Sequence, residues 1–297
     1  MTAPRKMHEG EAHTDPDLVR RLVRGQFPQW AHLTVTRLAS GGTVNAIYRL
    51  GPGLTVRLPL LPGGAESLDD EARRLSRLAP LLPVPIPEAV ALGEPAEGYP
   101  YRWAVHRWLD GEVLTEGTGS KELARDLASF VTALREVPVP GGPPAYRGAP
   151  LRTADAETRS WLEKLRATGE PFDTDALLTA WETALQTPEW TGRPRWTHSD
   201  LMPSNLLGAD GRLTAVLDFE TAGVGDPAVD LIPAWNLLTP AARQVFRDAV
   251  DVDDATWARG RGWALSMAVT QLPYYRHTNP VISANARYVL RQILDSR

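Results

Sequence analysis

The hydrophobic pattern changes its period near Asp110, and this change limits the fold more than any other feature of the sequence. Before Asp110 the apolar residues lie in short alternating runs separated by glycine and proline, a pattern typical of β-strands. After Asp110 they recur at helical spacing, most clearly over residues 123–134. The pattern predicts an α+β protein in two parts, with residues 1–110 rich in strands and residues 111–297 mostly helical.

The first part is predicted to be a small antiparallel sheet that carries one main helix. Asp15 and Pro16 suit the N-cap and first position of a short helix that ends near Arg24. The segment Gly51-Pro52-Gly53 joins two apolar runs at the spacing of a hairpin. The expected strands cover residues 32–38, 46–50, 54–58, 90–93 and 102–109, and the main helix covers residues 67–78.

The second part has a helical pattern with one exception. Helices are predicted over 241–250, 255–269 and 281–294. Residues 197–219 differ, because they contain a loop followed by two short apolar runs. This segment is therefore expected to form a small hairpin inside the helical part.

Composition excludes several kinds of site. The 297 residues contain no cysteine, which rules out disulfide frameworks, thiolate zinc sites and cysteine nucleophiles. The net charge of −4, from 32 basic and 36 acidic side chains, argues against a nucleic-acid-binding protein. Residues 1–16 are polar, and no run approaches the roughly 20 apolar residues of a membrane helix. We expect a cytoplasmic protein that binds neither nucleic acid nor membrane.

The residues that carry chemistry lie in the exceptional segment. Asp200 is followed five residues later by Asn205, and Asp218 comes thirteen residues after that, at the end of an apolar run. Phosphoryl transfer needs such a set, because one carboxylate can accept the proton of the attacking hydroxyl while hard oxygen ligands hold magnesium. A hairpin would hold these groups in fixed positions.

Two other readings of this segment remain open. His13 also has an aspartate two residues on, so His-x-Asp alone is a weak signal, but only His198 has an asparagine at plus seven. The segment could then be a loop of Asp and Asn caps and turns. A metal-dependent hydrolase using His198 and Asp200 is a poorer alternative, because the other histidines offer no second ligand motif.

Residues 198–230 resemble the catalytic region of the aminoglycoside phosphotransferase family, a branch of the protein-kinase-like fold. The family pattern is matched by His198, Asp200, Asn205, Asp218-Phe219, Gly225-Asp226-Pro227 and Asp230. The resemblance implies that Asp200 is the catalytic base and that Asn205 and Asp218 bind Mg²⁺. It also implies structural roles for Asp230 and His198, and a two-lobed fold.

By the same resemblance, residues 1–110 form the nucleotide-binding lobe and residues 111–297 the lobe with the catalytic loop and the acceptor site. Ser40, Gly41, Gly42 and Thr43 occupy the place of the loop that covers the phosphates, although a plain hairpin connection is the alternative. The family lysine is replaced by Arg57, whose partner is expected to be Glu71. Arginine is always charged and binds phosphate through a fork, so phosphate contact is retained with altered geometry.

His106 and Trp108 match the hinge segment, where backbone groups would hold the nucleotide base. The implied cofactors are ATP, with GTP as an alternative, and Mg²⁺. The implied partner is a small-molecule hydroxyl acceptor, and the protein is expected to be a monomer or homodimer. The alternative to an active kinase is a catalytically impaired nucleotide-binding module, which the replacement by Arg57 leaves open.

The acceptor is expected to be an aminoglycoside-type antibiotic, with a macrolide or another small metabolite as the alternative. Resistance and biosynthetic roles both remain open. Two groups of residues in the helical part point to different acceptors. An acidic group, which a polyamine sugar would favour, consists of Asp248, Asp251, Asp253 and Asp254, and a solvated helix junction with an N-cap is the alternative. An aromatic group, which a macrolide would favour, consists of Trp235, Trp263, Tyr274 and Tyr275, and core packing is the alternative. Glu220 also follows the metal-binding segment and could face the acceptor.

Overall fold

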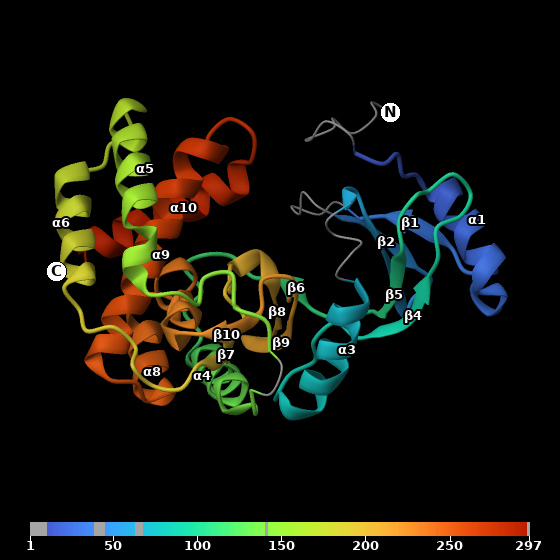
Figure 1. Cartoon of the computed structure of the whole chain (residues 1–297), viewed down its shortest axis with the longest axis horizontal. Coiled ribbons are helices and arrows are strands. Elements are labelled where there is room, and N and C mark those ends of the chain that lie inside the picture. Colours follow the sequence, from blue (N-terminus) through green and yellow to red (C-terminus); the bar gives the residue numbers. More distant parts are fainter. Residues whose placement is uncertain (1–10, 39–44, 63–67, 140–141, 296–297) are drawn as a thin grey trace. The chain divides into compact units, whose positions relative to one another are not determined.

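The computed structural model describes residues 11–38, 45–62, 68–139 and 142–295 (Figure 1). The chain divides into two compact units, one made of residues 1–80 and 86–110 and the other of residues 81–85 and 111–297. The chain therefore crosses between the units at three places, and five residues of the linker belong to the second unit.

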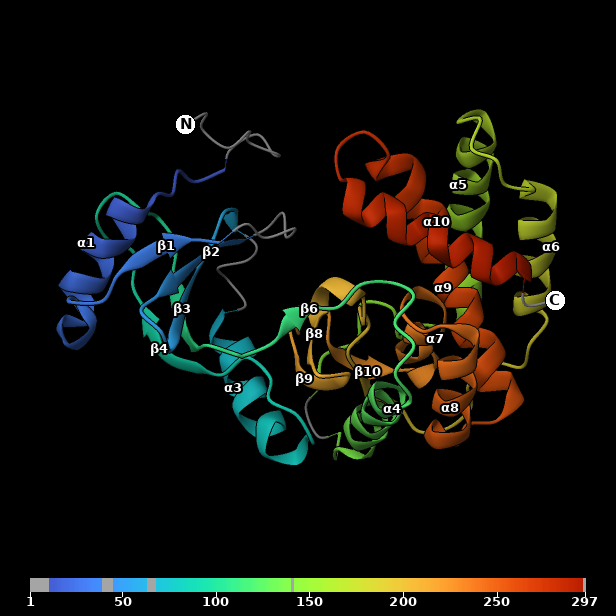
Figure 2. The same cartoon turned by 180° about the vertical axis from the view of Figure 1, so that it is seen from behind.

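The first unit is built on a five-stranded antiparallel sheet in the order β1-β2-β3-β5-β4. Helices α1 and α3 and the short 3₁₀ turns η1 and η2 accompany it in the described part of the chain (Figure 2). The elements are α1 (Pro16–Gln26), η1 (Pro28–Trp30), β1 (Val35–Arg37), β2 (Asn45–Leu50), β3 (Leu54–Pro59), α3 (Leu68–Leu78), η2 (Ala79–Leu81), β4 (Ala89–Gly93) and β5 (Trp103–Arg107).

Local sequence signals account for the beginning of this unit. The Asp15 side chain accepts a hydrogen bond of 2.7 Å from the backbone N–H of Leu18, as predicted for the N-cap of α1. The β2–β3 hairpin turns at Gly51, whose φ of +58° lies in the left-handed region that glycine adopts without strain. These signals confirm the predicted helix start and the predicted hairpin.

The two faces of the sheet have different surroundings. Apolar residues of α1 pack against Tyr48, Val56 and Val105 to form the core of the unit. Because side chains alternate along a strand, Arg57 and His106 lie on the opposite face. That face therefore carries the polar residues that the sequence assigned to nucleotide.

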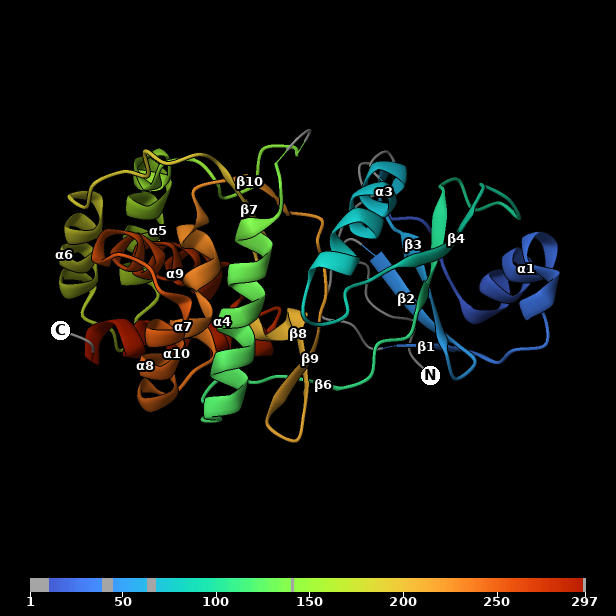
Figure 3. The same cartoon turned by 90° about the horizontal axis from the view of Figure 1, so that it is seen from below.

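The second unit consists of helices around two small β-elements (Figure 3). One element is the sheet β6-β8-β9 and the other is the antiparallel pair β7–β10. The strands are β6 (Glu112–Val113), β7 (Arg195–Thr197), β8 (Leu206–Ala209), β9 (Arg212–Val216) and β10 (Gly223–Gly225). The helical elements are α4 (Lys121–Glu136), η3 (Leu151–Ala154), α5 (Asp155–Ala167), α6 (Thr174–Leu185), η4 (Pro203–Asn205), η5 (Pro227–Leu231), α7 (Pro233–Asn236), α8 (Pro240–Val250), α9 (Asp254–Tyr275) and α10 (Pro280–Asp295).

Helix α9 is the central helix of this unit and contacts α5, α6, α10 and η5. Its middle, from Gly260 to Val269, is buried at nearly every position. It continues beyond the predicted end at Val269 to Tyr275, with Pro273 in the last turn. Among the described residues, no helix has both the length and the apolar character needed to cross a bilayer.

The linker residues 81–85 belong with the second unit through a main-chain contact. The backbone N–H of Val216, the last residue of β9, donates to the carbonyl of Pro85 at 3.1 Å. The prolines at 83, 85 and 87 restrict the backbone of this stretch, in which residues 82–84 form bends. The linker thus extends the edge of the hairpin that carries the predicted catalytic residues.

Candidate functional site

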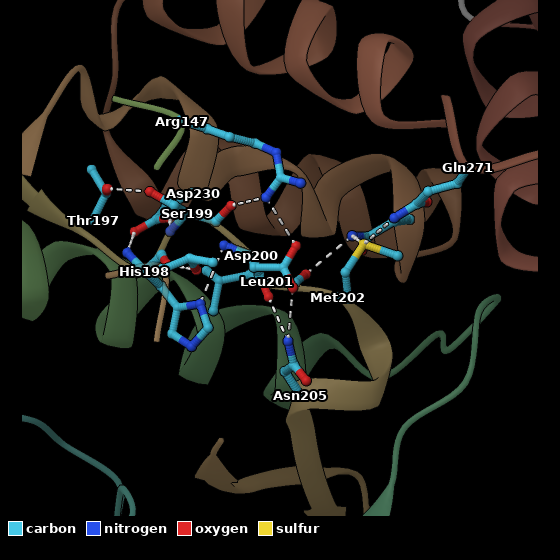
Figure 4. Close-up of polar contacts among 12 residues, drawn as sticks. Arg147, Thr197, His198, Ser199, Asp200, Leu201, Met202, Asn205, Asp230 and Gln271 are labelled. Carbon is cyan, nitrogen blue, oxygen red and sulfur yellow. Dashed lines mark hydrogen bonds and ion pairs between the residues drawn. The ribbon is translucent and has the colours of Figure 1, made fainter. Parts of the chain in front are cut away.

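The predicted catalytic loop leaves β7 at His198 and ends in the 3₁₀ turn η4, from which β8 begins. Asp230 fixes the start of this loop (Figure 4). Its two carboxylate oxygens accept hydrogen bonds from the backbone N–H groups of His198, at 2.7 Å, and Ser199, at 2.9 Å. Both N–H groups are buried, so the carboxylate satisfies donors that would otherwise lack partners. The buttressing contact predicted for Asp230 is present.

Ser199 has a left-handed backbone, with φ of +68°. This conformation is costly for a residue with a side chain and persists only where neighbouring contacts fix it. The Asp230 bonds supply that restraint, and the Ser199 hydroxyl pairs with that of Thr197 at 2.9 Å. The turn at Ser199 determines the direction in which the next residue, Asp200, leaves the loop.

His198 is fully buried and faces away from the reacting groups. Its Nδ1 accepts the backbone N–H of Asp200 at 3.3 Å, so Nε2 carries the ring hydrogen and donates to the carbonyl of Leu217 at 2.8 Å. The ring also packs edge-on against Phe219. His198 therefore joins the catalytic loop to the end of β9, in agreement with the structural role inferred from the sequence.

Asp200 and Asn205 are in direct contact. The Asn205 Nδ2 group donates to the Asp200 backbone carbonyl at 2.9 Å and to Asp200 Oδ2 at 3.2 Å. The Asp200 side chain is 26% exposed, so solvent reaches the carboxylate. These two hydrogen bonds fix the Asn205 amide relative to the carboxylate predicted to be the base.

The hairpin brings Asp218 to the same end as Asn205. Leu206 pairs with Val216, and the backbone N–H of Leu217 donates to the Asn205 carbonyl at 2.8 Å. Asp218 follows with φ of +59°, a second left-handed residue, and is exposed. The structure therefore brings together Asp200, Asn205 and Asp218. Within the described ranges, no group of three or more His, Asp or Glu side chains forms a metal cluster.

Arg147 is part of this site and was missed by the sequence reasoning. Its Nη1 donates to the Ser199 carbonyl at 3.0 Å and to Asp200 Oδ1 at 3.2 Å, and its guanidinium stacks on Tyr146. The segment that carries it packs so closely on β10 that a Cβ at Gly225 would lie 2.4 Å from Gly148 Cα. Arg147 lies in a loop with no recognisable motif. The only sequence signal was Gly225, whose lack of a side chain lets the loop that carries Arg147 pack against β10.

The charges around Asp200 act in opposite directions. Burial raises the pKa of Asp200 above its usual range, and the Asp218 carboxylate adds to this, whereas the Arg147 guanidinium and the hydrogen bond from Asn205 act to lower it. Burial also raises the pKa of Asp230 to about 6, against the opposing effect of its hydrogen bonds to His198 and Ser199. The guanidinium of Arg147 is therefore the principal charge favouring the ionised form of Asp200.

The Gly-Asp-Pro motif forms a support beneath the loop. Asp226 caps η5 through the backbone N–H of Ala228 and pairs with Arg259 of α9. The Nε–Oδ2 distance is 2.7 Å, and both side chains are almost fully buried, with 3% and 4% exposed. No role for Arg259 was predicted from the sequence. It lies 33 residues after Asp226, in a helix recognised only from its apolar residues.

In the first unit, Arg57 Nη1 donates to Glu71 Oε1 at 2.8 Å, so the expected pair is present. The neighbouring carboxylates of α3 pair elsewhere, Asp69 with Arg102 and Asp70 with Arg73, so neither competes with Glu71 for Arg57. The predicted phosphate loop, Ser40 to Thr43, lies outside the described residues.

His106 and Trp108 occupy different environments. His106 is buried beside Arg57, and burial together with the Arg57 charge lowers the pKa of His106 to about 4. The Trp108 ring stacks on the Arg49 guanidinium, and its Nε1 donates to Asp110 at 2.8 Å. Their assignment to the nucleotide stays a prediction.

A sequence model described as "Phosphotransferase enzyme family" matches residues 34–263, which include the catalytic loop, the hairpin and Arg57. The chain belongs to this family. It is a phosphotransferase, as the His198–Asp230 pattern predicted. No protein of curated function matches the chain in sequence.

Solved structures of aminoglycoside and macrolide phosphotransferases have a fold similar to that of this chain. The macrolide 2'-phosphotransferase MphH from Brachybacterium faecium, as apoenzyme, is 24% identical, with a TM-score of 0.64 over 95% of this chain and 98% of that one. The GDP complex of wild-type aminoglycoside 2'-phosphotransferase-IIIa is 20% identical, with a TM-score of 0.68 over 95% and 99%. The GDP and kanamycin complex of APH(2")-IIIa is 21% identical, with a TM-score of 0.65 over 93% and 97%. These likenesses, together with the five-stranded sheet and the larger helical part, confirm the predicted protein-kinase-like α+β fold.

Proposed function

We propose that the chain transfers the terminal phosphoryl group of ATP or GTP to a hydroxyl of a small molecule, with Mg²⁺ as cofactor. The observation that carries this proposal is the position of the Asp200 carboxylate. One oxygen accepts from Arg147 and the other from Asn205, on a loop whose backbone is held by Asp230. Fixed positioning of this kind is what phosphoryl transfer mainly requires from a protein.

In this proposal Asp200 is the base. Its carboxylate accepts the proton of the acceptor hydroxyl as that oxygen attacks the phosphorus, and the partial exposure of the side chain gives the acceptor access. The contacts to Arg147 and Asn205 leave lone pairs on both oxygens for this proton. His198 cannot share the role, because both of its ring nitrogens are engaged by the backbone.

Asn205 and Asp218 fit a magnesium site. The Asn205 amide nitrogen is directed to Asp200, so its oxygen points the other way (Figure 4). Asp218 presents an exposed carboxylate at the same end of the hairpin. Both are hard oxygen donors, and Mg²⁺ is usually held by one or two protein groups together with water and phosphate. Bound Mg²⁺ would neutralise charge on the phosphates during transfer.

The first unit is proposed to hold the nucleotide on the sheet face that carries Arg57. Its guanidinium, paired with Glu71, supplies a permanent positive charge for the phosphates. His106 and Trp108 belong to the segment proposed to hold the base, and Ser40 to Thr43 are proposed to cover the phosphates. Two structures of similar fold contain GDP, so ATP and GTP are tested side by side.

The acceptor classes to test first are aminoglycosides and macrolides, which the names of similar structures contain. One feature favours the less cationic class. Asp253 and Asp254 of the predicted acidic group lie at the start of α9, about 25 Å along the helix from Gln271, which contacts Met202 of the loop. Asp253 there caps α9, and Asp254 pairs with Arg247.

The predicted aromatic group is divided between core and surface. Trp235 and Trp263 are buried, whereas Tyr274 is 59% exposed and packs edge-to-face against Trp161 and Tyr275. Burial, Tyr274 and the Asp200 carboxylate raise the pKa of Tyr275, which places this phenol within the electrostatic influence of the base. Tyr274 and Tyr275 are therefore proposed to contact the acceptor.

The decisive experiment compares Asp200→Ala with the wild-type protein and with the exposed control Asp175→Ala on α6. Transfer from ATP and GTP is measured over a panel of aminoglycosides, macrolides and other hydroxylated antibiotics, and Mg²⁺-nucleotide binding is measured by calorimetry. We expect Asp200→Ala to lose transfer by at least 10²-fold while its nucleotide affinity stays within twofold. Full residual activity would contradict the base assignment. Nucleotide binding without transfer to any acceptor would favour an impaired kinase-like module.

A further inference from the structure

A small cavity lies directly behind the catalytic loop, inside the second unit. Its volume is about 10 Å³, roughly that of one water molecule. The polar side chains that line it are Asn236, Gln271 and Asn285, and the remaining lining, which includes Met202 and Met267, is apolar. Together with Met202, the polar residues come from four parts of the unit, namely the loop, α7, α9 and α10.

Two amide oxygens at this cavity are buried and unsatisfied. Asn236 is 2% exposed and Asn285 is 4% exposed, and within the described residues neither Oδ1 atom has a hydrogen-bond partner. The amide nitrogens are already engaged, Asn236 Nδ2 with the Leu201 carbonyl at 3.0 Å and Asn285 Nδ2 with the Asn236 carbonyl at 2.7 Å. Turning either amide over would set its oxygen against a carbonyl, so both oxygens are fixed as acceptors.

We propose that this cavity binds one water molecule, which donates to Asn236 Oδ1 and Asn285 Oδ1. The chemistry of the lining selects such a ligand. Two neutral acceptors need a double donor, the volume admits one heavy atom, and no carboxylate among the lining residues would balance a cation. The water would add a second bridge between Asn285 and Asn236, beside the direct hydrogen bonds that already link α10 through Asn285 and Asn236 to the loop.

This chain ends at the residues that follow the proposed base. Asn236 Nδ2 holds the Leu201 carbonyl and also approaches Met202 Sδ at 3.6 Å, and the Met202 backbone N–H donates to the Asp200 carbonyl at 2.7 Å. Gln271 Nε2 approaches the same sulfur at 3.9 Å (Figure 4). Asn236 and Asn285 are therefore positioning residues for Asp200. This positioning role, unlike the water site, rests on the proposed function.

The water site is tested by a crystal structure of the full chain at a resolution that defines ordered water. We expect one density peak between about 2.7 and 3.2 Å from both Oδ1 atoms. The site is disproved if the cavity holds no density, or if either amide has turned to a protein partner.

The positioning role is tested with Asn285→Leu, which is similar in size but removes both polar atoms. The matched control is Ser283→Ala, which removes another buried polar group from the same helix outside the cavity. Amide hydrogen exchange over residues 198–206 should be at least tenfold faster in Asn285→Leu and unchanged in Ser283→Ala. Unchanged exchange in Asn285→Leu would overturn the coupling, whether or not the protein transfers phosphate.

A second readout relates this coupling to catalysis. For an acceptor that the wild-type protein phosphorylates, Asn285→Leu should lower kcat about tenfold and leave the KM for nucleotide within twofold. Faster exchange with unchanged kcat would retain the hydrogen-bond chain but exclude its positioning role. Absence of transfer by the wild-type protein would count against the proposed function and leave the exchange result to decide the coupling.

Discussion

Each unit contains a buried arginine–carboxylate pair, and the two pairs are built differently. In the second unit Arg259 donates to both oxygens of Asp226, to the Pro188 carbonyl and to the Thr256 hydroxyl, and it is 3% exposed. In the first unit Arg57, which is 12% exposed, donates to Glu71 on the sheet face that also carries His106.

The comparison suggests different roles for the two pairs. Asp226–Arg259 supports the fold, whereas Arg57–Glu71 is proposed to bind the phosphates of a nucleotide. Full enclosure with several acceptors makes the Asp226–Arg259 pair costly to break, and it lies beneath the catalytic loop. The Arg57–Glu71 pair is on the face that would meet the phosphates in the proposed function. Substitutions in the two pairs should therefore have their largest effects on different quantities, stability in one case and affinity in the other.

The largest expected effect is on the stability of the second unit. Arg259→Met leaves the Asp226 carboxylate buried without its counter-charge, and should lower the free energy of unfolding by about 3–5 kcal/mol. Urea unfolding followed by tryptophan fluorescence measures this change. Arg247→Met is the matched control, because its partner Asp254 is 93% exposed, and it should change stability by less than about 0.5 kcal/mol. Equal effects of the two substitutions would remove the distinction between enclosed and open pairs.

The next effect sharpens the contrast through pH. The pKa of His106 is about 4 in the folded protein and about 6.5 in the unfolded chain. Between these pH values His106 is protonated in the unfolded chain but not in the folded protein, which favours unfolding. The contribution of His106 to stability should thus fall by about 3 kcal/mol between pH 6.5 and 4, and it is measured as the difference between the stability–pH curves of wild type and His106→Gln. His106→Gln should remove this part of the pH dependence, and the exposed His32→Gln should retain it. Parallel stability–pH curves for wild type and His106→Gln would contradict the assignment.

The third effect is on nucleotide affinity. Arg57→Ala removes the proposed phosphate contact and should weaken Mg²⁺-nucleotide binding by roughly tenfold or more, as loss of a hydrogen bond to a charged group does. Arg57→Lys keeps the charge without the fork and should cost only a few-fold. Calorimetric titration measures both, with the exposed Arg77→Ala on α3 as control. Unaltered affinity in Arg57→Ala would place the phosphates elsewhere.

The smallest expected effect is on the stability of the first unit, through the N-cap of α1. Asp15→Ala removes the N-cap of α1 and should lower stability by about 1 kcal/mol. Asp17→Ala, in the first turn of the same helix, should have a smaller effect because its side chain is exposed and caps no backbone N–H. Thermal unfolding distinguishes the two variants. If both changes were the same size, the cap would contribute no more than the helix dipole does.

The sequence predicted the parts of the fold that depend on local signals. Asp15, Gly51 and the pattern from His198 to Asp230 each act within a few residues or through a recognisable spacing, and the structure has the expected helix, hairpin and braced loop. The helix end predicted at Val269 was wrong, because α9 continues to Tyr275 with Leu272 buried and with Pro273 inside its last turn.

The contacts between distant segments could not be predicted in the same way. Arg147 and Arg259 reach carboxylates 53 and 33 residues away, and Asn285 reaches Asn236 across 49 residues. A single sequence contains no periodicity or spacing that relates such positions. The aspartates could be identified from their motif, whereas the arginines and amides that fix them depend on how the helices pack.

The five linker residues that belong to the second unit affect how members of this family can be recombined. Neither unit is one continuous stretch, because Leu81 to Pro85 lie with β9 while the segments on both sides belong to the sheet. A chimaera joined at Asp110 would therefore pack residues 81–85 of one parent against the hairpin of the other parent, at whose end Asp218 lies. Exchanging the first unit without disturbing that hairpin requires Leu81 to Pro85 to come from the same parent as residues 111–297.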